Sequence, residues 1–265
     1  MPCSNGYGLL EDSEILPEEK FEKILVGALN PKVYLAPWRS LWAAGKLHEI
    51  KIPSTCEYTI LKWEWEIPEI SKIILESGVN GVFCTSTGKK CPLKTYLYPD
   101  FVRPEITSSN SKSGVFFMGW VNNILRRSIF AQYKDKFSVT LRDSYYSYDQ
   151  SRNKEFDREY VSGLASASVC LCPRGVGSGT RRFWESLRAE AVPMLISDEL
   201  ALPSCWSWEE TIIRVSERRA IYSPNALWHA AQCKDIESKR QMCKLASQYF
   251  INPDNIARYI NDVVK

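Results

Sequence analysis

Short apolar runs alternate with helix-like segments through the second half of the chain, and this alternation constrains the fold more than any other feature. The apolar runs predict buried strands over 115–120, 137–141, 169–172, 193–196 and 212–215. Helical spacing is found over 121–133, 155–167, 181–190, 225–250 and 254–264. The connections are long enough for helical crossovers, so consecutive strands can run parallel. This half therefore predicts a doubly wound α/β lobe.

A stretch rich in proline, serine and asparagine, residues 99–114, predicts a linker between two packed units. The boundary predicts an N-terminal lobe over 1–105 and a C-terminal lobe over 106–265. The first part predicts strands over 33–36, 61–67 and 82–84 and helices over 17–29 and 68–77. The expected fold class is α/β, with parallel sheets and a smaller N-terminal lobe.

Charge and hydropathy exclude several classes of protein. Lysine and arginine number 34 and aspartate and glutamate 31, which gives a net charge of +3. A nucleic-acid binder normally carries a more concentrated basic surface, so no nucleic-acid partner is expected. No apolar run reaches the roughly 18 residues of a membrane span. The N-terminal residues lack the basic and apolar regions of a signal peptide.

The cysteines favour a reducing compartment. Their number is nine, which is odd, and several lie in apolar runs where a small buried side chain is suitable. No glycosylation sequon is present. These features predict free thiols and a cytoplasmic location. Cys170 and Cys172 have the wrong spacing for zinc, and His48 and His229 lie near no cysteine pair, so no metal site is expected.

The stretch 168–198 reads as strand, glycine loop, helix and strand, and it predicts an anion site. Its alternating glycines let the backbone approach a ligand closely. Arginines flank the loop, and the amides at the helix start favour an anion, with Thr180 expected to cap the helix. The predicted donor-site residues are Arg174, Gly175, Gly177, Ser178, Gly179, Thr180, Arg181 and Arg182.

Glu185 lies on the same predicted helical face as Arg181 and Arg182. One interpretation is an intrahelical ion pair, worth roughly 0.2–0.5 kcal/mol. The other is that its carboxylate accepts hydrogen bonds from the ribose hydroxyls of a nucleotide whose phosphates lie on the arginines.

Three classes of nucleotide site are compatible with a glycine loop. A P-loop requires Gly-Lys-Ser/Thr at the helix start, whereas this loop ends Gly-Thr-Arg-Arg. A dinucleotide site requires an acid roughly 20 residues after the glycines, and Asp198 has this spacing from Gly177. The glycine pattern is a partial match, however, and it follows the third strand of its lobe rather than the first. A nucleotide-sugar site fits these residues best.

The sequence resembles the exostosin-like family of inverting glycosyltransferases. The match includes the run Cys172-Pro173-Arg174-Gly175 together with Arg182, Glu185 and Pro193. A looser match covers 98–167. Ser186 replaces the usual alanine of the family pattern, and a family histidine segment has no counterpart.

The resemblance implies a GT-B architecture of two Rossmann-like lobes, with a UDP-sugar bound mainly by the C-terminal one. It also implies inversion at the anomeric carbon, with no metal and no other cofactor. Arg174 and Arg182 would bind the diphosphate, and Glu185 would bind the ribose. The pair Arg126-Arg127 resembles a basic segment of the family, so Arg127 would be a second phosphate contact, although a solvated helix face would also explain the pair.

Two aspartates are candidates for the base that activates the acceptor. Asp100 lies at the predicted lobe junction, in a segment similar to that family, although capping the linker would explain it equally well. Asp143 follows a predicted strand, where a turn role is also plausible. The predicted acceptor contacts are aromatic: Trp63, Trp65, Tyr145 and Tyr146, with Tyr148 beside them. For the tryptophans, packing in a core is the commoner role.

The predicted function is inverting transfer of a hexose or a pentose, with xylose as one candidate, from a UDP-sugar to a hydroxyl of a glycan or glycoprotein. One alternative is an NAD(P)-dependent oxidoreductase that uses Asp198. The other is a non-catalytic module that binds a nucleotide or a glycan.

Overall fold

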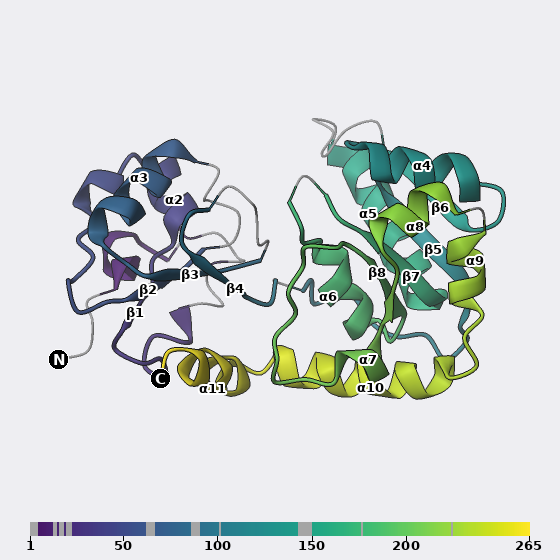
Figure 1. Ribbon diagram of the computed structural model, residues 1–265. Coiled ribbons are helices and arrows are strands. Elements are labelled where there is room, and N and C mark those ends of the chain that lie inside the picture. The colour runs from purple at the N-terminus through teal and green to yellow at the C-terminus, as the bar shows by residue number, and fades with distance from the viewer. Residues whose placement is uncertain are drawn as a thin grey trace. The chain divides into compact units, whose positions relative to one another are not determined.

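The computed structural model describes residues 5–12, 15, 19, 23–61, 67–85, 91–100, 102–142, 150–175, 177–223 and 225–265. The chain forms two compact units (Figure 1). Unit 1 consists of Met1–Phe101 together with Tyr249–Lys265, and unit 2 consists of Val102–Gln248. Unit 1 is the smaller, as predicted.

Unit 2 is built on a five-stranded parallel sheet in the order β6-β5-β7-β8-β9. Its elements are β5 (Ser113–Trp120), α4 (Ile124–Tyr133), β6 (Ser138–Arg142), α5 (Gln150–Ser166), β7 (Ala167–Pro173), α6 (Arg181–Arg188), β8 (Val192–Ile196), α7 (Trp208–Thr211), β9 (Ile213–Arg214), α8 (Glu217–Tyr222), α9 (Ala226–Ala231) and α10 (Ile236–Phe250). The predicted strands and long helices of the second half are confirmed. The short helices α7 and α8 were not predicted, because about one turn shows no periodicity.

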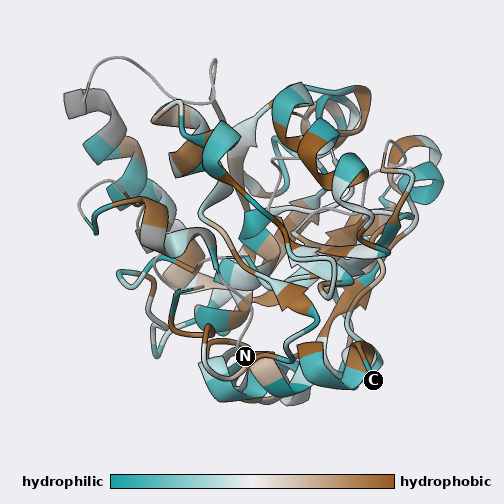
Figure 2. Ribbon diagram, turned by 90° about the vertical axis from the view of Figure 1, so that its left-hand side faces the viewer, coloured by the Kyte–Doolittle hydropathy of each residue, from teal (hydrophilic) through white to brown (hydrophobic). Residues whose placement is uncertain are grey.

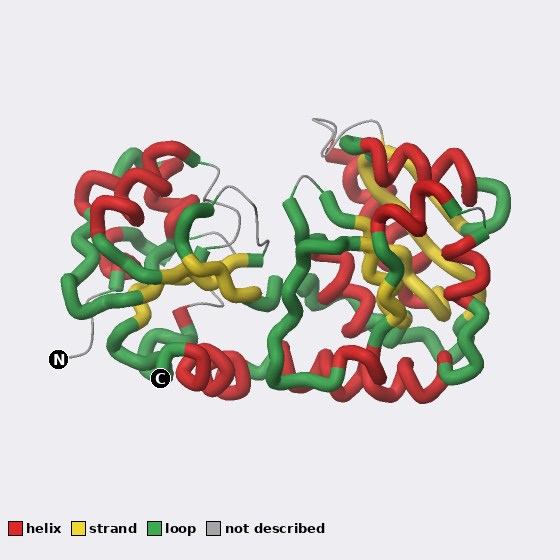
Figure 3. The backbone as a smooth tube through the Cα atoms, in the orientation of Figure 1, coloured by secondary structure: helices red, strands yellow, loops and turns green. Residues whose placement is uncertain are grey.

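Strand order determines where the helices of unit 2 lie. β6 and β7 pair with opposite edges of β5. Right-handed crossovers therefore place α4 and α5 on opposite faces of the sheet, which is the doubly wound arrangement (Figure 3). The chain reverses its direction of progress across the sheet between β5 and β7.

Unit 1 contains a four-stranded parallel sheet in the order β1-β2-β3-β4. Its elements are the 3-10 turn η1 (Gly6–Leu9), β1 (Val33–Tyr34), α2 (Trp38–Ala43), the 3-10 turn η2 (Leu47–Glu49), β2 (Tyr58–Ile60), α3 (Pro68–Ser77), β3 (Gly81–Cys84), β4 (Lys94–Leu97) and α11 (Pro253–Val263). Two parallel sheets confirm the predicted α/β class with two Rossmann-like lobes.

Local chemistry sets the bounds of α3. Pro68 occupies the first turn, where its missing N–H is not needed. Gly78 ends the helix with φ of 78°, a left-handed conformation that glycine adopts without strain. The predicted helix over 68–77 is confirmed. The predicted strands over 33–36 and 82–84 correspond to β1 and β3, whose residues are all buried, whereas β2 and β4 were missed because they mix polar with apolar residues and are partly exposed.

The C-terminal helix differs from the predicted lobe boundaries, because Tyr249–Lys265 belongs to unit 1. Ile256, Tyr259 and Ile260 are buried in the core of that unit. The Tyr259 hydroxyl donates to the carbonyl of Leu97 at 3.0 Å. A linear reading assigns a terminal helix to the lobe it follows, whereas an amphipathic helix packs wherever an apolar face is left uncovered.

Hydropathy follows the layers of each unit. The strands are largely apolar, and the helices carry an apolar stripe beside a polar one (Figure 2). Among the described helices, none is both long and apolar enough to cross a bilayer. The predicted strand over 61–67 and most of the predicted helix over 17–29 lie outside the described residues.

Candidate functional site

The predicted glycine loop emerges from the carboxyl end of β7, next to the end of β5. The direction of the chain reverses between these two strands, and ligands of doubly wound sheets bind at such a point. Along the chain, α4 follows β5 after three residues, and α6 follows β7 after the seven residues that contain the loop. The topology of unit 2 therefore confirms the position that the sequence predicted for the loop, at a ligand-binding edge of the sheet.

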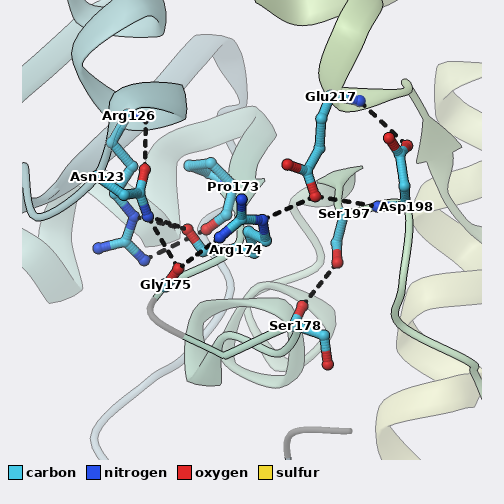
Figure 4. Close-up of polar contacts among 9 residues, drawn as sticks. All are labelled: Asn123, Arg126, Pro173, Arg174, Gly175, Ser178, Ser197, Asp198 and Glu217. Carbon is cyan, nitrogen blue, oxygen red and sulfur yellow. Dashed lines mark hydrogen bonds and ion pairs between the residues drawn. The ribbon is translucent and has the colours of Figure 1, made fainter. Parts of the chain in front are cut away.

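Hydrogen bonds to neighbouring strands hold the described residues of the loop. The amide of Arg174 donates to the carbonyl of Ile196 at 3.1 Å. The hydroxyl of Ser197 donates to the carbonyl of Ser178 at 2.8 Å (Figure 4). Ser178 is buried, whereas Gly177 and Gly179 are partly exposed. Both ends of the loop are thus tied to β8 and the residue that follows it.

Two side chains at the start of α4 donate to the carbonyls of the loop, and neither role was predicted from the sequence. Asn123 caps α4 through Oδ1, which accepts from the amide of Arg126 at 2.9 Å. Its Nδ2 donates to the carbonyl of Gly175 at 2.9 Å (Figure 4). Arg126 is buried, and its Nε donates to the carbonyl of Arg174 at 3.0 Å. The predicted contact, Arg127, is instead exposed on α4.

The first turn of α6 carries an unusual charge. Helix N-termini favour acidic residues, but α6 begins with Arg181 and Arg182 and has no acidic residue in its first turn. Thr180 occupies the N-cap position, yet its side chain makes no capping hydrogen bond, so the predicted cap is wrong. Two positive charges at an uncapped helix start are suited to an anion supplied by a ligand.

Arg182 is buried against β5. Its Nη2 donates to the carbonyl of Met118, and its guanidinium lies 4.5 Å from the centre of the Phe117 ring. Among the residues that the structure describes, Nε and Nη1 have no hydrogen-bond partner, and both are buried. Gly119 makes room for this side chain, since a Cβ there would lie 2.6 Å from Nη2. Buried polar atoms are usually paired, so these two nitrogens require a partner.

Glu185 is buried, and its hydrogen bonds are not to the arginines of its own helix. Oε1 accepts from Nε of Arg103 at 3.0 Å, and Oε2 accepts from the hydroxyl of Tyr160 at 2.6 Å. Burial, followed by the Glu185 charge, raises the pKa of Tyr160 well above its ordinary value. The tyrosine therefore stays protonated and donates. Arg103 also pairs with Asp157 at 3.1 Å, which links the start of unit 2 to α5 and α6.

Arg174 is partly exposed and forms an ion pair with Glu217, whose carboxylate lies 2.8 Å from Nε. This hydrogen bond raises the pKa of Arg174. The same Glu217 oxygen accepts from the amide of Asp198 at 3.3 Å. Oδ1 of Asp198 in turn accepts from the amide of Glu217 at 3.1 Å (Figure 4). Asp198, the carboxylate that the oxidoreductase alternative requires, is thus hydrogen-bonded to the first residue of α8.

The other predicted residues are placed as follows. Asp100 is partly buried, three residues after β4 and at the end of the first segment of unit 1. The second base candidate and the aromatic acceptor contacts lie outside the described residues: Asp143, Trp63, Trp65, Tyr145, Tyr146 and Tyr148.

No disulfide joins any of the cysteines among the described residues. Burial raises the pKa of Cys170, which keeps this thiol protonated beside the site. Within the same part of the chain, no three of the His, Cys, Asp and Glu side chains gather in a way that could hold a metal ion.

Comparisons with known proteins match the region that contains this site. The Exostosin GT47 domain model matches residues 79–227, which is more than half of the chain. An 81-residue segment is 43% identical to the Exostosin-1 homolog of Caenorhabditis elegans and covers 29% of this chain and 21% of the relative. A segment of 116 residues is 28% identical to Exostosin-1c of Danio rerio, covering 43% and 16% of the two chains. The alignments thus span about a fifth or less of these relatives.

Among solved structures, sucrose-phosphate synthase from Thermosynechococcus elongatus aligns with a TM-score of 0.48 and 14% identity, over 94% of this chain and 79% of that one. The match to the family model, by contrast, covers the glycine loop, α6 and the start of α8, which are the elements that build the site. The predicted resemblance is confirmed: this chain belongs to the exostosin GT47 family of glycosyltransferases.

Proposed function

We propose that the chain is an inverting glycosyltransferase that binds the diphosphate of a UDP-sugar at the glycine loop and transfers the sugar to a glycan hydroxyl. In this proposal no metal takes part, and the sugar is a hexose or a pentose such as xylose. Arg174, Arg181, Arg182 and the amides at the start of α6 contact the diphosphate.

The charge at the start of α6 is the observation that carries the proposal. An uncapped helix begins with two arginines next to a third, Arg174, at the point where the strand order reverses. Among the described residues, Nε and Nη1 of Arg182 are buried without a hydrogen-bond partner. Glu217 pairs with one of the three guanidinium groups, that of Arg174, and an anion bound at the helix start would add negative charge beside the cluster. A diphosphate supplies negative charge, and its oxygens accept hydrogen bonds from arginine forks and backbone amides.

Transfer with inversion is a single displacement. The acceptor hydroxyl loses its proton to a carboxylate while its oxygen forms a bond to the anomeric carbon. The bond from that carbon to the phosphate oxygen breaks, and UDP leaves with the electron pair. The arginines and loop amides stabilise the charge that develops on the leaving diphosphate, which is the work a divalent metal performs in other enzymes. Asp100 is the proposed base, and Asp143 is the alternative.

Binding can be measured by titrating the protein with UDP in the presence of EDTA, with NAD as the comparison ligand. We expect saturable UDP binding that weakens about tenfold in Arg174→Ala, since hydrogen bonds to charged groups contribute about 1.5–3 kcal/mol. Arg188→Ala is the matched control. It removes the same charge from the other end of α6, where Nε donates to the carbonyl of Ile106. Tighter binding of NAD than of UDP would support the oxidoreductase instead.

Glu185 has two competing roles, which pyrophosphate separates because it lacks a ribose. If the carboxylate contacts ribose, Glu185→Gln weakens UDP binding and leaves pyrophosphate binding unchanged. If it serves only as the buried partner of Arg103 and Tyr160, the substitution changes both affinities equally.

Turnover tests the base and distinguishes an enzyme from a binding module. We expect UDP release from a UDP-sugar in the presence of a glycan acceptor, with an inverted anomeric centre in the product by NMR. Asp100→Asn should lower kcat by 100-fold or more and leave the affinity for UDP unchanged. Loss of turnover in Asp143→Asn alone would transfer the role to that residue, and binding without turnover on any donor would support the non-catalytic module.

A further inference from the structure

Glu217 joins three separate segments around the proposed diphosphate site. Its Oε1 lies 2.8 Å from Nε of Arg174 at the end of β7 and 3.3 Å from the amide of Asp198 just beyond β8. Its own amide donates to Oδ1 of Asp198 at 3.1 Å, at the first position of α8 (Figure 4). The side chain is 16% exposed, and that of Arg174 is 27% exposed. This pair is therefore more constrained than a solvated surface ion pair.

The contact leaves one edge of the Arg174 guanidinium available. Nε is taken by Glu217, and Nη1 donates to the carbonyl of Gly175 at 3.3 Å. Nη2 makes no hydrogen bond among the described residues, and the group remains partly exposed. Without Glu217 the long arginine side chain would sample several rotamers, and ordering it upon binding would cost free energy.

We infer that Glu217 is a positioning residue for anion binding, which holds Arg174 in the orientation that receives the diphosphate. The inference rests on the proposed function, in which Arg174 contacts that group. Glu217 favours anion binding by orienting Arg174, whereas its negative charge disfavours anion binding. A carboxylate near a diphosphate repels it, so its net benefit must come from the hydrogen bonds that orient Arg174.

Because the charge of Glu217 and its hydrogen bonds have opposite effects on anion binding, substitutions by glutamine and by alanine should change the affinity for pyrophosphate differently. Glutamine retains an oxygen that accepts from Arg174 and from the amide of Asp198, but it removes the charge. Glu217→Gln should therefore bind inorganic pyrophosphate as tightly as the wild type or more tightly. Glu217→Ala removes the acceptor and frees Arg174, so its affinity for pyrophosphate should fall about five- to tenfold, within the usual range for coupled neighbours.

A double-mutant cycle distinguishes positioning from a general effect on the fold. Pyrophosphate is titrated into the full chain at low salt, with Glu217→Ala made in the wild type and in Arg174→Gln. If Glu217 acts through Arg174, the alanine substitution should change the affinity less than twofold in the second background. Glu237→Ala is the control, because it breaks another Arg–Glu pair of unit 2, with Arg240 at 2.6 Å on α10.

Two results would overturn the inference: equal weakening by Glu217→Ala in both backgrounds, or tighter binding in Glu217→Ala than in the wild type. UDP is titrated in parallel to separate this test from that of the proposed function. If pyrophosphate binds and UDP does not, the nucleotide-sugar proposal is overturned. The double-mutant cycle of Glu217 and Arg174 can still be measured with pyrophosphate in that case. Binding of neither ligand would overturn both.

Discussion

At the scale of single residues, the unusual feature is an arginine placed where a core side chain would normally lie. Arg182 packs over Phe117, donates to the carbonyl of Met118 and keeps two buried nitrogens without a hydrogen-bond partner among the described residues. Burying a charged group whose hydrogen bonds are incomplete is costly in a core. Gly119 allows it, because only a residue without Cβ leaves space for Nη2. We therefore regard Gly119 and Arg182 as acting together.

Gly119→Ala tests whether Arg182 requires the space that Gly119 leaves. The new Cβ would lie 2.6 Å from Nη2, so Arg182 must leave its position. We expect the free energy of unfolding, measured by urea denaturation, to fall by about 1–3 kcal/mol, which is the usual cost of an overpacked core. We also expect UDP to bind more weakly. Gly27→Ala is the control, since a Cβ there meets nothing within 4 Å. Unchanged stability and affinity in Gly119→Ala would show that Arg182 relocates without consequence.

At the scale of elements, the ends of helices build and support the site. α4 is capped by Asn123, whose amide nitrogen also donates to the carbonyls of Arg174 and Gly175. One side chain thus closes a helix and positions the loop. α11 has an N-cap of the same residue type, Asn252, which accepts from the amide of Asp254 at 2.9 Å.

These two caps form a matched pair of alanine substitutions. Removing an asparagine N-cap costs about 1 kcal/mol, so Asn123→Ala and Asn252→Ala should each lower stability by a similar amount in thermal or urea unfolding. Only Asn123→Ala should also weaken UDP binding, since it releases the carbonyls of the loop. Equal affinities in the two variants would contradict the role assigned to Asn123.

Lys112 joins the C-terminal ends of α5 and α6, because its Nζ donates to the carbonyls of Ala165 and Ala189. Burial, followed by the charge of Arg240, lowers the pKa of Lys112 to about 8. The unfolded chain holds this proton up to about pH 10.4 and binds more protons than the folded state above pH 8. The contribution of Lys112 to the free energy of unfolding therefore rises with pH between about 8 and 10.4.

Urea denaturation at pH 7, 8.5 and 10 checks this dependence. The difference in unfolding free energy between the wild type and Lys112→Met should move in favour of the wild type as the pH rises. Lys244→Met, at an exposed position on α10, is the control for the general titration of lysines. A constant difference across this range would contradict the shifted pKa.

At the scale of the whole molecule, the two units differ in how the chain builds them. Unit 2 is a continuous stretch, Val102–Gln248, whereas unit 1 combines Met1–Phe101 with Tyr249–Lys265. The core of unit 1 includes Ile256, Tyr259 and Ile260 of α11. The stability of unit 1 therefore depends on a helix more than 140 residues further along the chain.

Ile260→Ala should destabilise unit 1 selectively. Truncating a fully buried isoleucine costs about 2–5 kcal/mol. Hydrogen exchange followed peptide by peptide should show loss of protection in β1 to β4 and in α11, with the peptides of β5 to β9 unchanged. Arg258→Ala, at an exposed position on the same helix, is the control. Equal loss of protection in both units would contradict the division.

Much of unit 2 could be predicted from the sequence. Fully apolar strands, helices of two or more turns and a glycine loop with flanking arginines carry local signals, which follow from burial, periodicity and glycine's conformational freedom. The position of the loop at the carboxyl end of a parallel strand followed from these signals. In unit 1 the fully buried β1 and β3 carried the same apolar signal, whereas β2 and β4 mix polar with apolar residues and carried none. The short helices α7 and α8 lie below the length at which helical periodicity appears.

The sequence by itself determined the α/β class, the alternation of strands and helices in unit 2 and the cationic loop, because each depends on residues close together in the chain. Only the tertiary structure decided which side chains serve the loop: Asn123 and Arg126 rather than Arg127, and Glu217 as the partner of Arg174. It also decided that Glu185 contacts Arg103 and Tyr160, and that α11 joins unit 1. These choices depend on strand order and on which apolar faces remain uncovered, and both arise only when distant segments pack together.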